Sequence, residues 1–84
     1  MAKLTSMMNI GREMERKLAS VGIGSAEELI AAGAKPAFAR LKAAYPRTCL
    51  VHLYALEGAI GSTEFHSLSE AKKKELKEFS DSLK

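Results

Sequence analysis

The chain has 84 residues, of which 46% are hydrophobic, and a net charge of +3 at pH 7. This length predicts one domain, residues 1–84, with a radius of gyration of roughly 12 Å. The composition excludes a disulfide-stabilised protein and a membrane-spanning one. A single cysteine permits no internal disulfide, and no apolar run approaches the roughly eighteen residues of a membrane span. Because the N-terminus also lacks the apolar core of a signal peptide, we expect a cytoplasmic protein with no membrane partner.

The charge is distributed unevenly along the chain. Residues 1–48 hold eight basic and four acidic side chains, whereas residues 49–84 hold five basic and six acidic ones. A basic half of this kind is what a nucleic-acid footprint looks like, although surfaces of mixed charge are also ordinary. The basic residues of the first half are Lys3, Arg12, Arg16, Lys17, Lys35, Arg40, Lys42 and Arg47.

Glycine and proline lie at the ends of segments, and strict alternation of apolar and polar residues is not sustained anywhere. Both features predict an all-α fold, a compact bundle of five or six short helices. Ala2–Met8 is expected to form one short helical turn, in which Leu4 and either Met7 or Met8 cover the segment that follows.

That segment, Met8–Gly33, reads as turn, helix, turn, helix. A tight turn at Asn9-Ile10-Gly11 opens into a helix, and Gly22 suits the left-handed cap at its end. Ser25 and Glu28 then form a capping box that starts the second helix, which Gly33 ends. The spacing of four, four and three residues that indicates one helical face is found at Ile10, Met14, Leu18 and Val21.

The second half predicts three more elements. Lys35-Pro36 places a proline at the first position of a helix that Tyr45-Pro46 ends, with Phe38 and Leu41 buried. Pro46–Ile60 is apolar around more than half of its circumference, so it should be the central helix. Thr63–Leu68 is a loop with Phe65 and Leu68 as apolar plugs. The last helix, about residues 69–83, starts at a cap on Ser67 or Ser69, and its lysines and glutamates balance one another on a solvated face.

The functional interest lies at Gly11. A turn that opens directly into a helix directs unpaired backbone N–H groups to one place, at the positive end of the helix dipole. A phosphate can bind there if the backbone can be approached closely, which glycine permits. Gly11 is equally compatible with a purely structural corner. The residues of the candidate nucleic-acid site are Asn9, Ile10, Gly11, Arg12, Arg16 and Lys17.

Catalytic and metal chemistry find little support. Cys49 and His52 are three residues apart on one helix, and with His66 they supply three zinc ligands, but no fourth cysteine or histidine remains. Cys49 is expected to be a small core residue without the orienting neighbour that a nucleophile needs. We therefore expect no enzyme activity, no metal, no cofactor and no small-molecule substrate.

Two resemblances carry the prediction further. Met8-Asn9-Ile10-Gly11 resembles the last four places of the helix-hairpin-helix motif, hydrophobic-Pro-Gly-hydrophobic-Gly, with Met8 in place of proline and Asn9 in place of the first glycine. Asparagine tolerates the left-handed conformation, so the turn can survive the change. From about Leu4 to Phe79 the chain resembles the C-terminal domain of the TfoX (Sxy) family of bacterial competence regulators. The matching residues are Asn9-Ile10-Gly11, Val21-Gly22-Ile23, Leu29, Gly33-Ala34, Ala37-Phe38, Arg40-Leu41-Lys42, Pro46, Cys49-Leu50, Leu53–Ala59, His66 and Leu68.

The TfoX resemblance implies a helix-hairpin-helix, SAM-like arrangement in a bacterial cytoplasmic protein, and a link to the regulation of DNA-uptake genes. It supplies no catalytic residues. Two functional hypotheses follow. In the first, the chain is a non-enzymatic binding module whose hairpin at Asn9–Arg12 contacts a nucleic-acid backbone. In the second, it is a protein-interaction domain, or one that self-associates as a homodimer, and it uses Met7, Met8 and neighbouring apolar groups.

Overall fold

Turn and cap residues divide the chain into one short 3-10 helix and five α-helices within residues 2–64 and 67–83, which the computed structural model describes. No strand occurs in this part of the chain, so the expected all-α class is confirmed. The elements are η1 (Leu4–Ser6), α1 (Arg12–Ser20), α2 (Ala26–Ala32), α3 (Ala34–Ala44), α4 (Leu50–Ile60) and α5 (Glu70–Ser82). None of these helices is long and apolar enough to cross a membrane.

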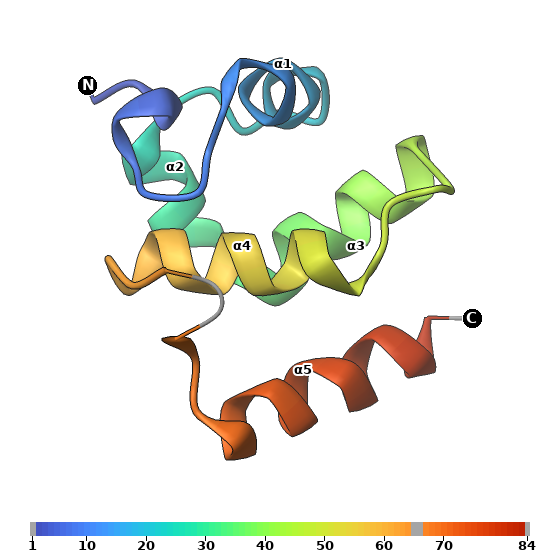
Figure 1. The fold of residues 1–84 in the computed structure, drawn as a ribbon. Helices are drawn as coiled ribbons and strands as arrows, with labels where there is room; N and C mark the ends of the chain where they lie inside the picture. Colours follow the sequence, from blue (N-terminus) through green and yellow to red (C-terminus); the bar gives the residue numbers. More distant parts are fainter. Residues whose placement is uncertain (1, 65–66, 84) are drawn as a thin grey trace.

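The helices lie in three tiers (Figure 1). The hairpin α1–α2 forms the upper tier with η1, α3 and α4 form the middle tier, and α5 lies below α4. The radius of gyration is 11.6 Å, close to the value expected from the length. The middle tier contacts elements on both sides of it: α3 contacts the hairpin helices and α4 contacts α5, so the two helices share the central place that was expected of α4 alone.

One cluster of buried residues joins the upper and middle tiers and reaches α5. Phe38 is fully buried within it, and Leu76 is its one buried member from α5 among the described residues. Leu4 is also fully buried, as expected for a residue that covers the hairpin. The cluster consists of Leu4, Ile10, Leu18, Ile23, Leu29, Ala34, Ala37, Phe38, Leu41, Leu53, Leu56, Ala59 and Leu76.

The expected caps of the hairpin form with one change of partner. Gly22 has a positive φ of 90°, the left-handed conformation that suits a residue without a Cβ. The Ser25 hydroxyl accepts a hydrogen bond from the Glu28 amide at 3.2 Å. The Glu28 carboxylate reaches back one residue further than expected and accepts from the amide of Gly24.

Several helix boundaries differ from those expected. Helix α3 begins at Ala34, so Pro36 is its third residue rather than its first. That position is still in the first turn, where a backbone amide has no partner within the helix. Proline, which has no amide hydrogen, is therefore tolerated there. Helix α4 begins at Leu50 rather than near Pro46, because Thr48 is buried and its hydroxyl bonds the Tyr45 carbonyl at 2.7 Å.

The N-cap of α5 is Ser69, which accepts from the Lys72 amide. Of the expected loop plugs, Leu68 packs against the core, whereas Phe65 lies outside the described residues.

Candidate nucleic-acid interface

Asn9 forms the corner that precedes α1. Its φ of 72° is the left-handed conformation that was expected of it. Its side-chain amide donates to the carbonyl of Thr63 at 2.9 Å and, more weakly, to that of Ala55 at 3.5 Å. The Asn9 side chain therefore points towards the end of α4 and the residues after it.

Ile10 has a structural place beside it. The residue is 6% exposed and belongs to the buried cluster. Its amide donates to the carbonyl of Met7 at 3.3 Å. Because both its side chain and its amide are engaged inside the molecule, Ile10 fixes the corner but offers no donor to a partner.

Gly11 is the open residue of the corner. Its φ of −96° and ψ of −179° describe extended backbone that any residue adopts. A Cβ added to it would meet no atom within 4 Å apart from its chain neighbours. Its carbonyl accepts from the Glu15 amide at 2.9 Å and so begins α1, whose first turn no side chain caps among the described residues. Neither backbone geometry nor packing requires glycine at this position.

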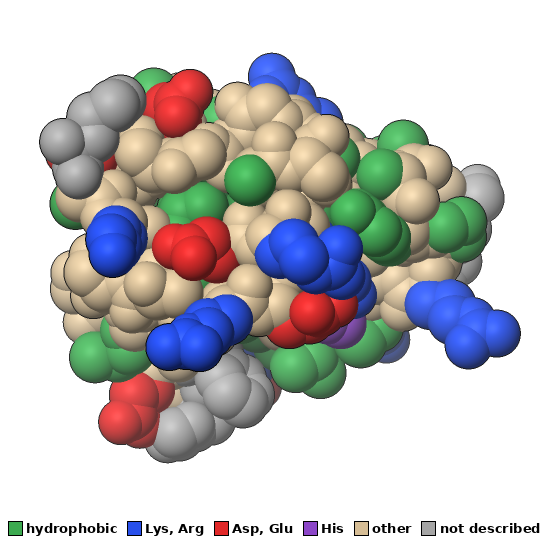
Figure 2. Space-filling view, turned by 90° about the horizontal axis from the view of Figure 1, so that it is seen from above, with side chains coloured by type: hydrophobic (Ala, Val, Ile, Leu, Met, Phe, Trp, Pro, Cys, Tyr) green, Lys and Arg blue, Asp and Glu red, His purple; other side chains and the backbone are tan. Residues whose placement is uncertain are grey.

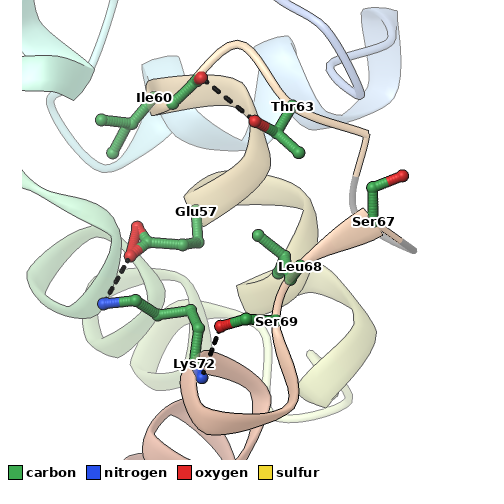
Figure 3. A pocket seen from close by; sticks show the side chains of 8 residues that line it. Glu57, Ile60, Thr63, Ser67, Leu68, Ser69 and Lys72 are labelled. Atoms are coloured by element: carbon green, nitrogen blue, oxygen red, sulfur yellow. Dashed lines mark hydrogen bonds and ion pairs between the residues drawn. The ribbon is translucent and has the colours of Figure 1, made fainter.

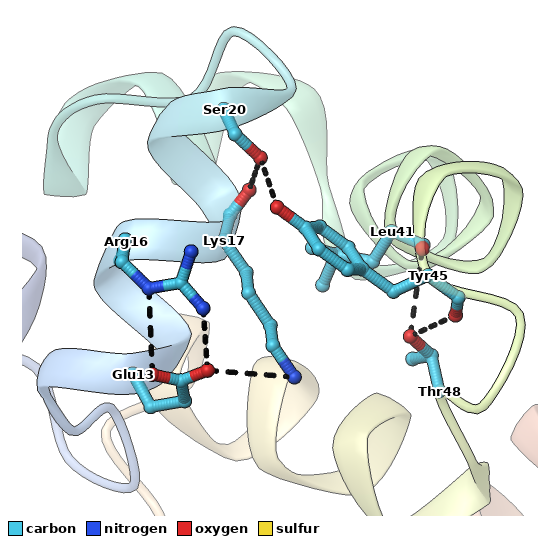
Figure 4. Close-up of polar contacts among 7 residues, drawn as sticks. All are labelled: Glu13, Arg16, Lys17, Ser20, Leu41, Tyr45 and Thr48. Atoms are coloured by element: carbon cyan, nitrogen blue, oxygen red, sulfur yellow. Dashed lines mark hydrogen bonds and ion pairs between the residues drawn. The ribbon is translucent and has the colours of Figure 1, made fainter.

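The three cations of the candidate site differ in what they contact. Arg12 is exposed at the first position of α1. Arg16 pairs with Glu13 at 2.6 Å, and Lys17 lies 3.8 Å from the same carboxylate (Figure 4). The hydrogen bond from Arg16 lowers the pKa of Glu13, and the reciprocal bond raises the pKa of Arg16. Opposite charges three and four residues apart meet on a helix surface, so the spacing of Glu13 gave a signal for this pairing that the sequence analysis did not use.

Tyr45 is a neighbour of the site that the sequence analysis did not single out for function. Its hydroxyl shares a hydrogen bond with that of Ser20 at 2.7 Å, and the Lys17 ammonium lies 5.2 Å from the centre of its ring. The end of α3 is thereby attached to α1 (Figure 4). The sequence does contain a signal that could have marked Tyr45 as functional, because this aromatic residue lies between two basic ones, Lys42 and Arg47.

The face seen from the side of the upper tier carries both signs of charge. Figure 2 shows acidic side chains lying next to basic ones there. The five charged residues of Arg12–Lys17 include three cations and two carboxylates, so the local excess is one positive charge. This excess suits weak, salt-sensitive contact with an anion more than tight electrostatic capture.

Cys49 is exposed at the N-cap of α4, so the expectation that it is a core residue is wrong. The cause is the late start of α4, which places Cys49 outside the apolar helix. Its thiol lies 3.3 Å from Nδ1 of His52, which also accepts the Cys49 amide at 3.1 Å. His52 therefore caps the helix. His66 lies outside the described residues, so the idea of a zinc trio is not tested.

A hollow of about 460 Å³ lies between the end of α4 and the start of α5 (Figure 3). Two charged side chains in its lining, Glu57 and Lys72, pair with each other at 3.4 Å. Lys72 also bonds Glu75 at 3.1 Å, and Ser69 is engaged in capping α5. These polar groups stabilise the junction of the two helices, and their pairing gives the hollow no evident chemistry of its own.

Comparisons with known proteins find one matching family and two similar crystal structures. The family described as the TfoX C-terminal domain matches residues 1–80. The triclinic crystal structure of an uncharacterized protein from Listeria monocytogenes is 44% identical, with a TM-score of 0.94, over 98% of this chain and 93% of that one. A tetragonal crystal structure of a protein of unknown function from the same organism is 42% identical, with a TM-score of 0.92, over 95% and 99% of the two chains. No curated protein matches.

Proposed function

The chain belongs to the TfoX C-terminal domain family, and from this membership we propose that it is a non-enzymatic, competence-related binding module of the bacterial cytoplasm. We propose further that it contacts a nucleic-acid backbone through the corner at Asn9–Arg12. The observation that carries this proposal is the open space at Gly11, where a Cβ would meet nothing within 4 Å.

The geometry of the corner supports contact with phosphate. Asn9, the residue most able to obstruct an approaching anion, has its side chain turned to Thr63 instead. The first amides of a helix have no partners within that helix, and the helix dipole favours negative charge at this end. Arg12 adds a cation at the same end of α1. Glu13 opposes binding, but its contacts with Arg16 and Lys17 offset its charge.

The absence of a catalytic role is part of the same proposal. The one pairing of a thiol with a histidine among the described residues is that of Cys49 and His52, where the imidazole already accepts the backbone amide of the N-cap. A histidine held as a helix cap is a poor general base, because its accepting nitrogen is occupied.

A titration with a fluorescently labelled 20-base-pair duplex tests the backbone contact by anisotropy. At about 20 mM salt we expect binding at micromolar to tens of micromolar concentration, which weakens steeply as salt is raised. Gly11→Glu should weaken binding about tenfold, because it places a carboxylate beside the amide donors. Gly11→Ala is the matched control, since it adds an uncharged side chain without a hydrogen-bond acceptor to the same open space.

A second pair of variants separates local from general electrostatics. Arg12→Glu and Lys74→Glu change the net charge equally, and both residues are exposed, but Lys74 lies on α5. Only Arg12→Glu should weaken binding strongly. No binding at tens of micromolar protein, or equal losses for the two variants, would refute the proposed site.

Self-association remains the second candidate, and one observation favours it. Met8 is 44% exposed, whereas Met7 packs against the core and offers less surface to a partner. Single exposed apolar residues are ordinary on monomers, which places this candidate behind the first. Sedimentation of the chain and of Met8→Lys decides between them: a dimer that the substitution dissociates supports self-association, and a monomer in both cases refutes it.

A further inference from the structure

A second hollow, of about 320 Å³, lies where the end of α3 meets α1. It is lined by Lys17, Ala44, Tyr45, Pro46 and Arg47. Lys17 is six residues beyond Gly11, a rise of roughly 9 Å along α1. The hollow is therefore near the proposed corner; it shares Lys17 with the candidate site but contains none of residues 9–12.

The lining combines two cations with an aromatic ring and contains no carboxylate. Tyr45 is partly exposed, and hydrogen bonds hold both its side chain and its backbone in place. Its hydroxyl is bonded to Ser20 at 2.7 Å, and its carbonyl accepts from Thr48 at 2.7 Å (Figure 4). A ring that is fixed before binding loses little conformational freedom when a flat group packs against it.

Arg47 also belongs to an adjoining hollow of about 310 Å³, whose lining includes Lys42, Lys77 and the carboxylate of Asp81. Lys42 donates to the carbonyls of Pro46 and Thr48 at 3.0 and 2.8 Å, and so it holds the turn between α3 and α4. The two hollows thus share Arg47, and the cationic surface continues beyond Tyr45 along the turn.

We propose that this surface binds a single, unpaired strand of nucleic acid, with one base in the hollow against Tyr45 and Pro46 and the phosphates on either side near Lys17 and Arg47. An aromatic residue in a cationic groove is the usual arrangement for such strands, because every base has a face that stacks. A duplex cannot use the hollow in this way, since its bases are already stacked within it. The inference rests on the proposed nucleic-acid function and uses only Lys17 of the residues assigned to the candidate site.

The test uses Tyr54→Phe as the background, which leaves Tyr45 as the one tyrosine of a chain without tryptophan. A 12-residue deoxythymidine strand should quench the fluorescence of Tyr45 and bind more tightly than an abasic strand of equal length. In anisotropy titrations, Tyr45→Ala should weaken binding of the thymidine strand about tenfold, and Tyr45→Phe by less than twofold. Arg47→Glu should weaken it more than Lys74→Glu. A melting curve for Tyr45→Ala establishes that the variant is folded, and Arg47→Glu repeats the test without altering the ring.

The outcomes separate this inference from the proposed corner. The inference is overturned if the thymidine and abasic strands bind equally well. It is also overturned if neither Tyr45→Ala nor Arg47→Glu changes binding. If Gly11→Glu still weakens the duplex in that case, the corner stands. If Gly11→Glu has no effect while the thymidine strand depends on Tyr45, the corner falls and the inference stands. A uridine 12-mer titrated alongside shows whether the strand is RNA or DNA, and Tyr45-dependent binding of either supports the inference.

Discussion

Replacing Asn9 separates the two contributions that this residue makes to the corner. Its backbone occupies the left-handed region with φ of 72°, and its side chain donates to the carbonyl of Thr63 at 2.9 Å. Glycine keeps the backbone conformation and removes the donor. Alanine removes the donor and adds strain, because a Cβ is disfavoured at positive φ.

The expected free energies follow from these two terms. Loss of the hydrogen bond costs about 1 kcal/mol, since the Thr63 carbonyl is left without this partner at a partly buried site. Asn9→Gly adds about 0.5 kcal/mol through the greater freedom of glycine in the unfolded chain. Asn9→Ala adds instead about 1–2 kcal/mol of left-handed strain. The order of stability is therefore wild type, then Asn9→Gly, then Asn9→Ala, with total losses of about 1.5 and about 2–3 kcal/mol for the two variants.

Urea unfolding followed by circular dichroism at 222 nm measures both losses. In thermal unfolding they correspond to midpoints lower by roughly 6–12 °C and 8–24 °C for a domain of this size. If Asn9→Ala is as stable as the wild type, both the hydrogen-bond term and the strain term are refuted. Asn9→Gly less stable than Asn9→Ala would refute the strain argument alone.

Three further predictions concern residues elsewhere in the fold. Phe38→Ala should destabilise by about 3–5 kcal/mol in urea unfolding, because the ring is fully buried, and a loss below about 1 kcal/mol would contradict the assigned core. Ser25→Ala should cost about 1 kcal/mol by the same measurement, through loss of the cap on the Glu28 amide, while Ser62→Ala, at an exposed residue of the turn after α4, serves for comparison. Glu13 has a lowered pKa, so the small stability that its ionised form contributes is present above the ordinary glutamate pKa and is lost as pH falls through the lowered one. The difference in melting temperature between wild type and Glu13→Gln should accordingly be constant from about pH 7 to 5 and shrink below about pH 4, and a difference that grows on acidification would contradict this sign.

Local signals in the sequence were sufficient for much of the hairpin. Gly22 and Ser25 each have a geometry that depends on neighbours within a few residues: a left-handed φ in one case and a bond to the Glu28 amide in the other. Helix periodicity similarly indicates the buried face of α1, because Leu18 repeats four residues after Met14. These features depend on chain-local geometry, so a reading of the sequence can find them.

Contacts between distant parts of the chain were not accessible in the same way. Cys49 was expected in the core because it lies within the apolar segment Pro46–Ile60, but the burial of Thr48 against the end of α3 delays the start of α4 and leaves Cys49 exposed. The same turn places Tyr45 beside Lys17, although the two are separated by 28 positions in the sequence (45 − 17). No periodicity encodes such a contact, because it depends on how α3 packs against α1.

The candidate site illustrates why the distinction matters for function. Of the six residues expected there, Asn9 and Ile10 are engaged inside the fold, and Gly11 and Arg12 are open to the outside. Arg16 and Lys17 share the carboxylate of Glu13, and Lys17 also lies over Tyr45. The hairpin therefore offers two separate features to an anionic strand: backbone donors at the start of α1 and a cation beside an aromatic ring further along it. A duplex can use only the backbone donors, which its phosphates accept from. An unpaired strand can use these donors and also the aromatic ring. If nucleic acid is the ligand, the preference between duplex and single strand should follow Tyr45 rather than Gly11, because only the ring distinguishes a free base from a paired one.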